Sequence, residues 1–235
     1  MSLLNTQSLS LTLNAVNEAH LLGQTIAPAE RKRLAGWIAS RQGLPGAYRQ
    51  EWFAPTEQDF AEGIRLFTGE RIATGAGTAH ILGQEACRAL LLLGADGPAG
   101  EALDRASAGV AIFLTASAAF ERKVGRAFLG RYCCGKCSVS LWRHLAAGGM
   151  SQPMRREWLA AGMAGRKAAR TGDGRWRSLP FWYALSAVEA IDSPAALAEL
   201  RYAAPALQRL VKRPAGEDAY ARRRRAVAER CLARC

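Results

Sequence analysis

A tight turn followed by a proline recurs three times in the chain, and this pattern constrains its fold more than any other feature. The prolines are Pro98, Pro153 and Pro194, which stand 55 and 41 residues apart. Each follows an apolar segment that ends at a glycine or at Asp-Ser, and the segments are residues 80–93, 134–147 and 179–191. Because proline fits the first turn of a helix and glycine its end, the pattern predicts three pairs of helices.

Apolar side chains recur at helical spacing in the last pair. Leu185 and Val188 mark one stripe, and Leu197 and Leu200 mark the next. A helix pair with one apolar face cannot bury that face alone, whereas stacked pairs share a continuous core. We therefore predict an all-α fold of stacked antiparallel hairpins, an α-solenoid or a partial α/α toroid of about ten helices. One domain would span residues 1–235, with a less regular part at 1–77, three hairpin units at 78–213 and a basic helix at 214–235.

The less regular part carries weaker helix signals. Residues 7–23 and 28–42 read as helices, and Pro28 would open the second. Thr56, with Asp59 three residues later, resembles a capping box. This pattern predicts a helix of about three turns that ends near Gly69.

Composition agrees with a helical protein. Hydrophobic residues make up 49% of the sequence, enough for a packed core, and long alternation of Val, Ile and Tyr is absent. The N-terminus lacks a basic region followed by a long apolar stretch, so no signal peptide is predicted. The uncharged run at residues 106–120 would be roughly 22 Å long as a helix, too short for a bilayer. We expect a cytoplasmic protein without a membrane span, whose six cysteines are thiols or metal ligands rather than disulfides.

The positive charge of the chain is confined to its second half. The formal net charge is +12, but residues 1–110 carry 9 basic and 11 acidic side chains, and residues 111–235 carry 23 and 9. A surface with this excess attracts phosphates and other acidic partners. The alternative is that the arginines only solvate helix faces. The run Arg222-Arg-Arg-Arg225 cannot form one face, since helical neighbours stand about 100° apart.

Arginine and aromatic residues are interleaved in this basic half. Arg131-Tyr132 and Arg175-Trp176-Arg177 occupy equivalent loops before a helix. Arginines there could hold phosphates while a ring stacks on a base. The alternative places the rings in the core and the arginines in solvent. The candidate nucleic-acid-binding residues are Arg131, Tyr132, Arg143, Arg175, Trp176, Arg177, Arg222, Arg223, Arg224 and Arg225.

Cysteines gather at the start of the second hairpin. Cys134-Gly-Lys-Cys137 is a C-x-x-C pair, and Cys133 stands beside it. Two such thiolates can share one zinc ion, but a tetrahedral site needs two more ligands. His144 lies about 10.5 Å further along the helix axis than Cys137 and cannot share that ion. The remaining candidate ligands are Cys133, Cys87, His80, Cys231 and Cys235.

Two other interpretations of the cysteines stay open. Arg131 and Lys136 could lower the pKa of a thiol at this helix start and make a redox pair. Alternatively, the cysteines pack as small apolar residues at a close contact between helices.

Two short segments resemble known helical families. Residues 184–211, with the turn Ile191-Asp-Ser-Pro194, resemble a HEAT-type hairpin. The segment Gly172-Asp-Gly-Arg-Trp-Arg is similar to the Q-x-x-D-G-x-W repeat of prenyltransferase and triterpene-cyclase α/α toroids, a resemblance that implies a prenyl or terpenoid substrate. The acidic D-x-D-D run of the cyclases is absent from this sequence.

These observations predict a non-enzymatic helical-repeat module whose basic half binds an acidic partner, with DNA or RNA favoured and zinc as the candidate metal. One alternative is an enzyme with its site in the concave face of the array. A third interpretation is a structural protein that associates with itself. The side chains expected to converge in the enzyme are Glu85, His80, His144 and Asp173, while Glu189 is a further candidate carboxylate.

Overall fold

The computed structural model describes residues 3–124, 130–212 and 216–235. These residues form ten helices and one two-stranded antiparallel sheet, which confirms the all-α class. The elements are α1 (Leu9–Leu21), α2 (Pro28–Ser40), α3 (Glu57–Glu62), β1 (Ile64–Arg65), β2 (Arg71–Ile72), α4 (Gly75–Leu93), α5 (Gly97–Lys123), α6 (Gly135–Ala146), α7 (Gln152–Ala168), α8 (Phe181–Ala190), α9 (Pro194–Val211) and α10 (Ala219–Ala233).

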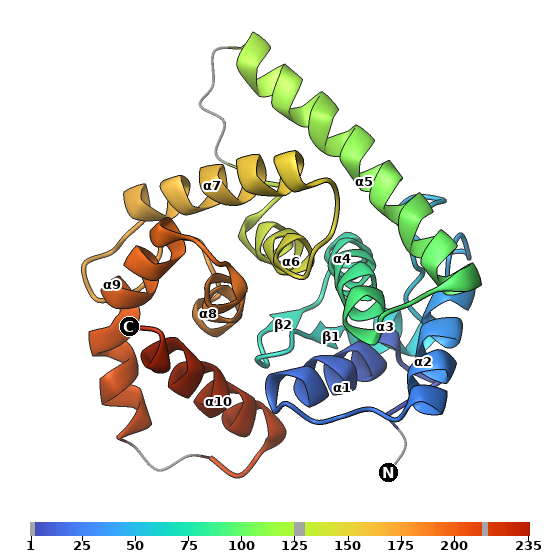
Figure 1. The fold of residues 1–235 in the computed structure, drawn as a ribbon, viewed down its shortest axis with the longest axis horizontal. Helices are drawn as coiled ribbons and strands as arrows, with labels where there is room; N and C mark the ends of the chain where they lie inside the picture. Colours follow the sequence, from blue (N-terminus) through green and yellow to red (C-terminus); the bar gives the residue numbers. More distant parts are fainter. Residues whose placement is uncertain (1–2, 125–129, 213–215) are drawn as a thin grey trace.

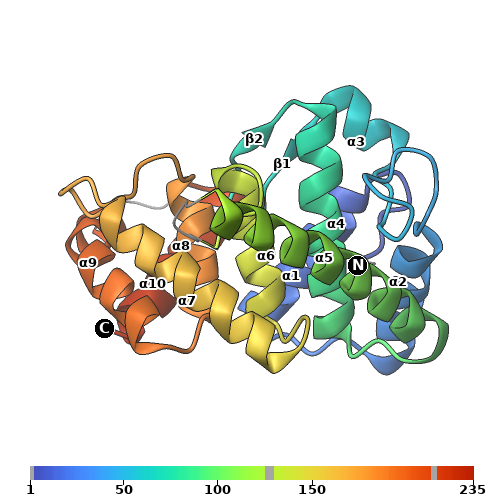
Figure 2. The same cartoon turned by 90° about the horizontal axis from the view of Figure 1, so that it is seen from above.

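Five helices close a ring. In the order α1, α4, α6, α8 and α10, each helix contacts the next, and α10 contacts α1. Figure 1 shows α4, α6 and α8 nearly end-on, with α5, α7 and α9 outside them. Figure 2 shows α3, β1 and β2 together at one end of this ring. The predicted boundary of the hairpin region at residue 213 lies outside the described residues.

The three predicted helix pairs are α4–α5, α6–α7 and α8–α9, and the helices of each pair contact one another. Gly94 ends α4 with φ of +64°, the left-handed conformation that glycine favours. Proline stands in the first turn of α5, α7 and α9. The Ser193 hydroxyl caps α9 by accepting from the Ala196 amide. The turn–proline pattern therefore marks real helix boundaries.

The helix predicted from Thr56 to near Gly69 is wrong in its second half. Its capping box between Thr56 and Asp59 is confirmed. However, Gly63 has φ of +69° and ends α3, and Ile64 then begins β1. Gly69, with φ of +99°, lies in the turn between β1 and β2. The two glycines allow backbone conformations that other residues rarely adopt, so the chain forms a short hairpin instead of continuing the helix.

Helix α5 is only partly covered by the rest of the protein. It packs on α2 and α4, yet Ile112 is 70% exposed and Phe120 is 60% exposed. By length and composition alone, this is one helix of the described residues that could cross a membrane, and a third of its most apolar window is buried. The helix is 27 residues long, because it extends beyond the uncharged run at both ends.

Candidate functional site

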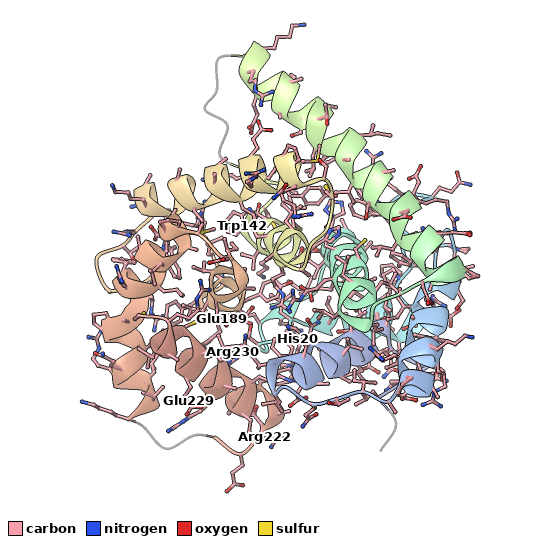
Figure 3. The ribbon with its side chains drawn as sticks, viewed as in Figure 1. His20, Trp142, Glu189, Arg222, Glu229 and Arg230 are labelled. Carbon is pink, nitrogen blue, oxygen red and sulfur yellow. The ribbon has the colours of Figure 1, made fainter. Side chains whose placement is uncertain are left out.

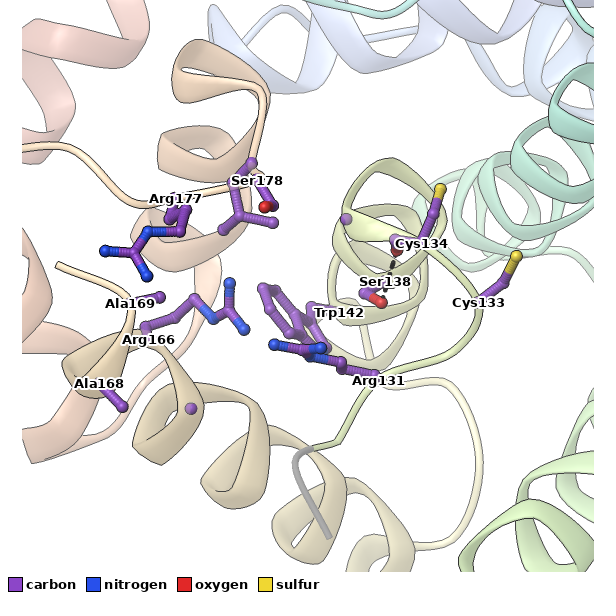
Figure 4. Close-up of a pocket in the computed structure, with 13 residues that line it drawn as sticks. Arg131, Cys133, Cys134, Ser138, Trp142, Arg166, Ala168, Ala169, Arg177 and Ser178 are labelled. Carbon is purple, nitrogen blue, oxygen red and sulfur yellow. Dashed lines mark hydrogen bonds between the residues drawn. The ribbon is translucent and has the colours of Figure 1, made fainter. Parts of the chain in front are cut away.

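Three arginines converge on a pocket between α6, α7 and the loop before α8. Arg131 precedes α6, Arg166 lies on α7 and Arg177 precedes α8. The pocket has a volume of about 250 Å³, and Figure 4 shows Trp142 and Ser138 among its lining residues. Arg131 and Arg177 are exposed, whereas Arg166 is 3% exposed. The exposed side chains of Arg131 and Arg177 therefore border the pocket together with the buried side chain of Arg166.

Close packing fixes the loop that carries Arg131. The Trp142 indole Nε1 donates to the Gly130 carbonyl at 3.0 Å. Gly130 has φ of +57°, and a Cβ there would lie 2.5 Å from the Trp158 carbonyl oxygen. A Cβ at Gly162 would lie 2.8 Å from the Trp142 ring. Glycine at these two positions lets the loop, the indole and α7 approach closely.

Arg177 is placed by backbone bonding to the end of the previous helix pair. Its amide donates to the Ala169 carbonyl at 2.8 Å. Beside this hydrogen bond, Arg170 and Trp176 form an isolated antiparallel β-bridge. The loop before α8 is thereby held against the end of α7, which brings Arg177 to the same pocket as Arg131.

The pocket arginines have no acidic partner among the described residues. Arg166 donates through Nε to the Gly162 carbonyl at 3.3 Å and lies over the Trp142 ring at 5.2 Å. Burial lowers the pKa of Arg166, and the nearby charge of Arg131 lowers it further. Glu199 is the acid whose charge opposes this shift, but it accepts bonds from Arg170 at 2.8 Å and Trp176 at 2.7 Å. Three unneutralised guanidinium groups favour binding of an anion.

The two aromatic residues expected to stack on bases are in the core. Tyr132 is 6% exposed, and its ring packs on Trp52 and Phe113. Trp176 is 4% exposed. The prediction of stacking platforms is therefore wrong for both, because their rings fill the interior beside the loops. Arg175 is exposed and lies 3.8 Å from Asp173.

Arg143 is also unavailable to a partner. It is 2% exposed and pairs with Glu85, with 2.7 Å between Nε and Oε1. The hydroxyl of Tyr183 donates to the same Oε1 at 2.6 Å. Burial opposes ionisation of Glu85, but the charge and hydrogen bonds of Arg143 lower its pKa overall. Arg143 is a core ion-pair residue at the centre of the ring, and its prediction as a phosphate contact is wrong.

The arginine run on α10 is bonded to the protein itself. Arg223 pairs with Glu18 at 2.7 Å, and Arg224 donates to the Thr68 carbonyl at 2.6 Å. Arg225 pairs with Glu229 at 2.9 Å, while Arg222 donates to a backbone carbonyl at 2.6 Å. Figure 3 shows Arg222 on the side of α10, away from Trp142. These four side chains point in different directions, as their spacing predicted.

A cluster of thiols lies on the other side of the same loop. Cys134 is the N-cap of α6, and its Sγ is 3.5 Å from the Sγ of Cys137. The Cys137 Sγ is 3.8 Å from Nδ1 of His80 on α4. Ligand atoms of His80, Cys133 and Cys137 all lie within 4.8 Å of one another. Burial opposes ionisation of Cys134, but hydrogen bonds from the Cys137 and Lys136 amides lower its pKa.

The other candidate ligands lie elsewhere. His144 is fully buried, and its Nδ1 donates to the Gln84 side-chain oxygen at 2.8 Å. Cys87 is buried, and burial raises its pKa to about 12. Cys231 lies on α10 and is buried beside the Leu185 carbonyl, and Cys235 contacts the backbone of Cys231. Of the candidates outside the C-x-x-C pair, His80 and Cys133 join the cluster within the described ranges.

The residues expected to converge in an enzyme do not meet in one site. Glu85 lies in the ring, His144 is packed beside it, His80 belongs to the thiol cluster and Asp173 is in an exposed loop. A central pocket of about 560 Å³ does open among the five ring helices, and Arg88 and Arg143 also line it. Figure 3 shows His20, Glu189 and Arg230 there, and Arg230 pairs with Glu189 at 2.9 Å.

No family model, curated protein or solved structure matches this chain.

Proposed function

We propose that the protein is a helical binding module that holds a phosphate group of an acidic partner, nucleic acid being favoured, in the pocket of Arg131, Arg166 and Arg177. The observation that carries this proposal is the convergence of these three guanidinium groups without an acidic partner in the described chain. Guanidinium groups suit phosphate, because their planar donors bond two oxygens at once.

The arrangement suits a phosphate at the end of a strand, or at a sharp bend of its backbone, better than a phosphate in a flat surface contact. Arg166 would form the floor of the pocket, since it is 3% exposed and its position is fixed over Trp142. Arg131 and Arg177 would close over the phosphate from the two loops. A bound phosphate would offset the mutual repulsion of the three charges, which otherwise destabilises the empty pocket.

Nucleic acid is favoured as the source of this phosphate by the charge of the whole region. Residues 111–235 carry 23 basic against 9 acidic side chains. Such an excess steers a polyanion toward the pocket over distances on the order of the Debye length. The enzymatic alternative has less support, because Glu85 and Glu189 are engaged in ion pairs with Arg143 and Arg230.

The test is binding of labelled single-stranded DNA and RNA, measured by fluorescence anisotropy over a range of salt concentrations. We expect Arg131→Gln and Arg177→Gln each to lower the affinity by about 10-fold or more, the loss of one charge-assisted hydrogen bond. Each should also reduce the slope of log K against log salt by about 1.

Arg222→Gln is the matched control, because it removes the same charge from an exposed site where the guanidinium bonds the Glu217 backbone carbonyl. We expect it to change the affinity by less than about 2-fold, as befits a distant screened charge. Equal losses in all three variants, or no binding at low salt, would contradict the proposal.

A further inference from the structure

Four side chains with zinc-binding chemistry meet where α6 begins beside α4. The distance from Cys134 Sγ to Cys137 Sγ is 3.5 Å, and that from Cys137 Sγ to His80 Nδ1 is 3.8 Å. Cys133 is the third thiol, within 4.8 Å of His80 and Cys137. Around tetrahedral zinc, bonds of about 2.3 Å to sulfur and about 2.0 Å to nitrogen place ligand atoms about 3.5–3.8 Å apart. The distances from Cys137 Sγ to Cys134 Sγ and to His80 Nδ1 are close to that spacing.

The backbone holds the thiols in this position. The Cys134 carbonyl accepts from both the amide and the hydroxyl of Ser138, at 2.9 and 2.7 Å. The same hydroxyl accepts from the Tyr132 amide at 3.0 Å. Ser138 thereby folds the loop over the first turn of α6. The consequence is that the C-x-x-C pair presents both sulfurs on one side.

Besides its Nδ1 contact with Cys137 Sγ, His80 is oriented by aromatic rings. Its ring meets Tyr48 edge-on at a centroid distance of 3.6 Å and Tyr132 at 5.4 Å. Its Nε2 is buried and has no hydrogen-bond partner in the described chain. The packing of these rings fixes the direction in which Nδ1 faces Cys137.

Packing as small apolar residues accounts for some cysteines but not for these. Cys87 and Cys231 are buried in the core. Cys133 and Cys134, in contrast, are exposed. Figure 4 shows their sulfurs pointing away from Arg131 and the other pocket arginines. An apolar contact would not place two exposed sulfurs beside a buried thiol and an imidazole.

We propose that Cys133, Cys134, Cys137 and His80 bind one zinc ion. Thiolate and imidazole ligands select zinc over magnesium or calcium, which prefer oxygen. Four protein ligands leave no open position, so the ion has a structural role. It ties the loop that carries Arg131 to α4 and α6. This inference goes beyond the proposed phosphate binding, because Cys133 and Cys134 border the arginine pocket but turn their sulfurs away from its arginines.

The first test is the metal content of the purified full-length protein, measured by elemental analysis. We expect one zinc per chain, and none in Cys133→Ser or Cys134→Ser. Both substitutions are at exposed residues, so the helical circular dichroism should be retained. Cys235→Ser is the matched control, since Cys235 is an exposed cysteine outside the cluster, and it should keep the ion. Cys133→His places a different zinc ligand at this position and, unlike Cys133→Ser, should bind the ion.

A second test uses thiol reactivity and cobalt. With zinc bound, Cys235 should react quickly with a thiol reagent while Cys133 and Cys134 are protected, and a chelator should remove that protection. Cobalt in place of zinc should give the visible spectrum of a tetrahedral thiolate site. Protein without zinc that also fails to bind cobalt, or zinc retained by both Cys→Ser variants, would overturn the proposal. So would a Cys134–Cys137 disulfide found by mass spectrometry in protein purified without reductant.

Discussion

At the scale of single residues, the centre of the ring is held by buried charge. Asn17, Glu85, Arg88 and Arg143 come from α1, α4 and α6, and each is less than 8% exposed. Asn17 accepts from Arg88 at 2.9 Å and from Arg143 at 2.8 Å. A buried pair is costly to break, because the remaining charge loses its partner. Polar contacts here therefore specify how the inner helices meet.

Truncating this ion pair should be severely destabilising. We expect Glu85→Ala to lower the free energy of unfolding by about 3–5 kcal/mol, since Arg143 would stay buried without its partner. The measurement is urea unfolding followed by circular dichroism. Glu101→Ala on α5 removes an exposed carboxylate and should change stability by less than about 0.5 kcal/mol. A loss for Glu85→Ala as small as this control would contradict the role of the pair.

Buried His144 should make stability depend on pH. Burial lowers its pKa from 6.5 to about 4. The unfolded chain takes up a proton near pH 6.5, whereas the folded protein does so only near pH 4. The free energy of unfolding therefore contains the full contribution of neutral His144 above pH 6.5. It loses that contribution as the pH decreases to 4. At 1.36 kcal/mol per pKa unit, the loss is about 3 kcal/mol.

Urea unfolding at pH 7 and pH 4.5 checks this expectation. Part of the loss at low pH comes from other groups, so His144→Asn is the comparison. The variant should lose less stability than the wild type between the two pH values. Equal losses in the two proteins would show that His144 does not contribute.

At the scale of the elements, glycines decide how closely α6 and α7 approach. Trp142 of α6 fits against Gly162 of α7, and its indole holds the Gly130 carbonyl. The same contact places Arg166 over the indole ring. The arginine pocket is therefore built from the interface between two helices and not from a single loop.

Two glycine substitutions should have opposite effects. Gly162→Ala puts a Cβ 2.8 Å from the Trp142 ring and should cost about 1–3 kcal/mol, the range for an overfilled core. Gly36→Ala lies in α2 with no atom within 4 Å of the new Cβ and should stabilise by about 0.5–1 kcal/mol. Thermal unfolding measures both. The same sign of change in both variants would contradict this account.

The sequence determined the elements better than the site. Proline and glycine act locally, so the turns at Pro98, Pro153 and Pro194 could be predicted from neighbouring residues. The burial of Tyr132 and Trp176 depends on which helices meet, and no local pattern encodes that. The sequence did not single out Arg166 as a pocket residue, because one charged residue on a polar-looking helix gives no signal by itself. The available signal was the pair of small residues beside it, Gly162 and Gly165, which indicates a close contact between helices. His80 could be a candidate ligand from its residue type, but its distance to Cys137 depends on α4 and α6 being neighbours in the ring.

At the scale of the whole molecule, α10 closes the ring. It packs on α8, α9 and α1, and Val227, Ala228 and Cys231 are its buried residues. Arg223 adds an ion pair to Glu18. Loss of α10 would expose the apolar sides of α8 and α1 together.

Removing residues 217–235 should therefore abolish cooperative unfolding rather than lower stability slightly. We expect the shortened chain to keep helical far-UV circular dichroism, lose its near-UV signal and bind a hydrophobic dye, as loosely packed states do. Deletion of Cys235 alone is the control and should leave all three readouts unchanged. A shortened chain with native near-UV signal would show that α10 is dispensable.

The contact between α1 and α10 also affects how the chain folds while it is being synthesised. Glu18 and Arg223 stand 205 residues apart, and the Leu21 carbonyl and Arg230 stand 209 apart. A ribosome adds about 5–20 residues per second, so these contacts wait on the order of tens of seconds after α1 has been made. During synthesis the first helix can pack on α4, but its other edge stays uncovered until the last helix emerges. Newly made chains should consequently depend on chaperones most strongly before α10 has been made.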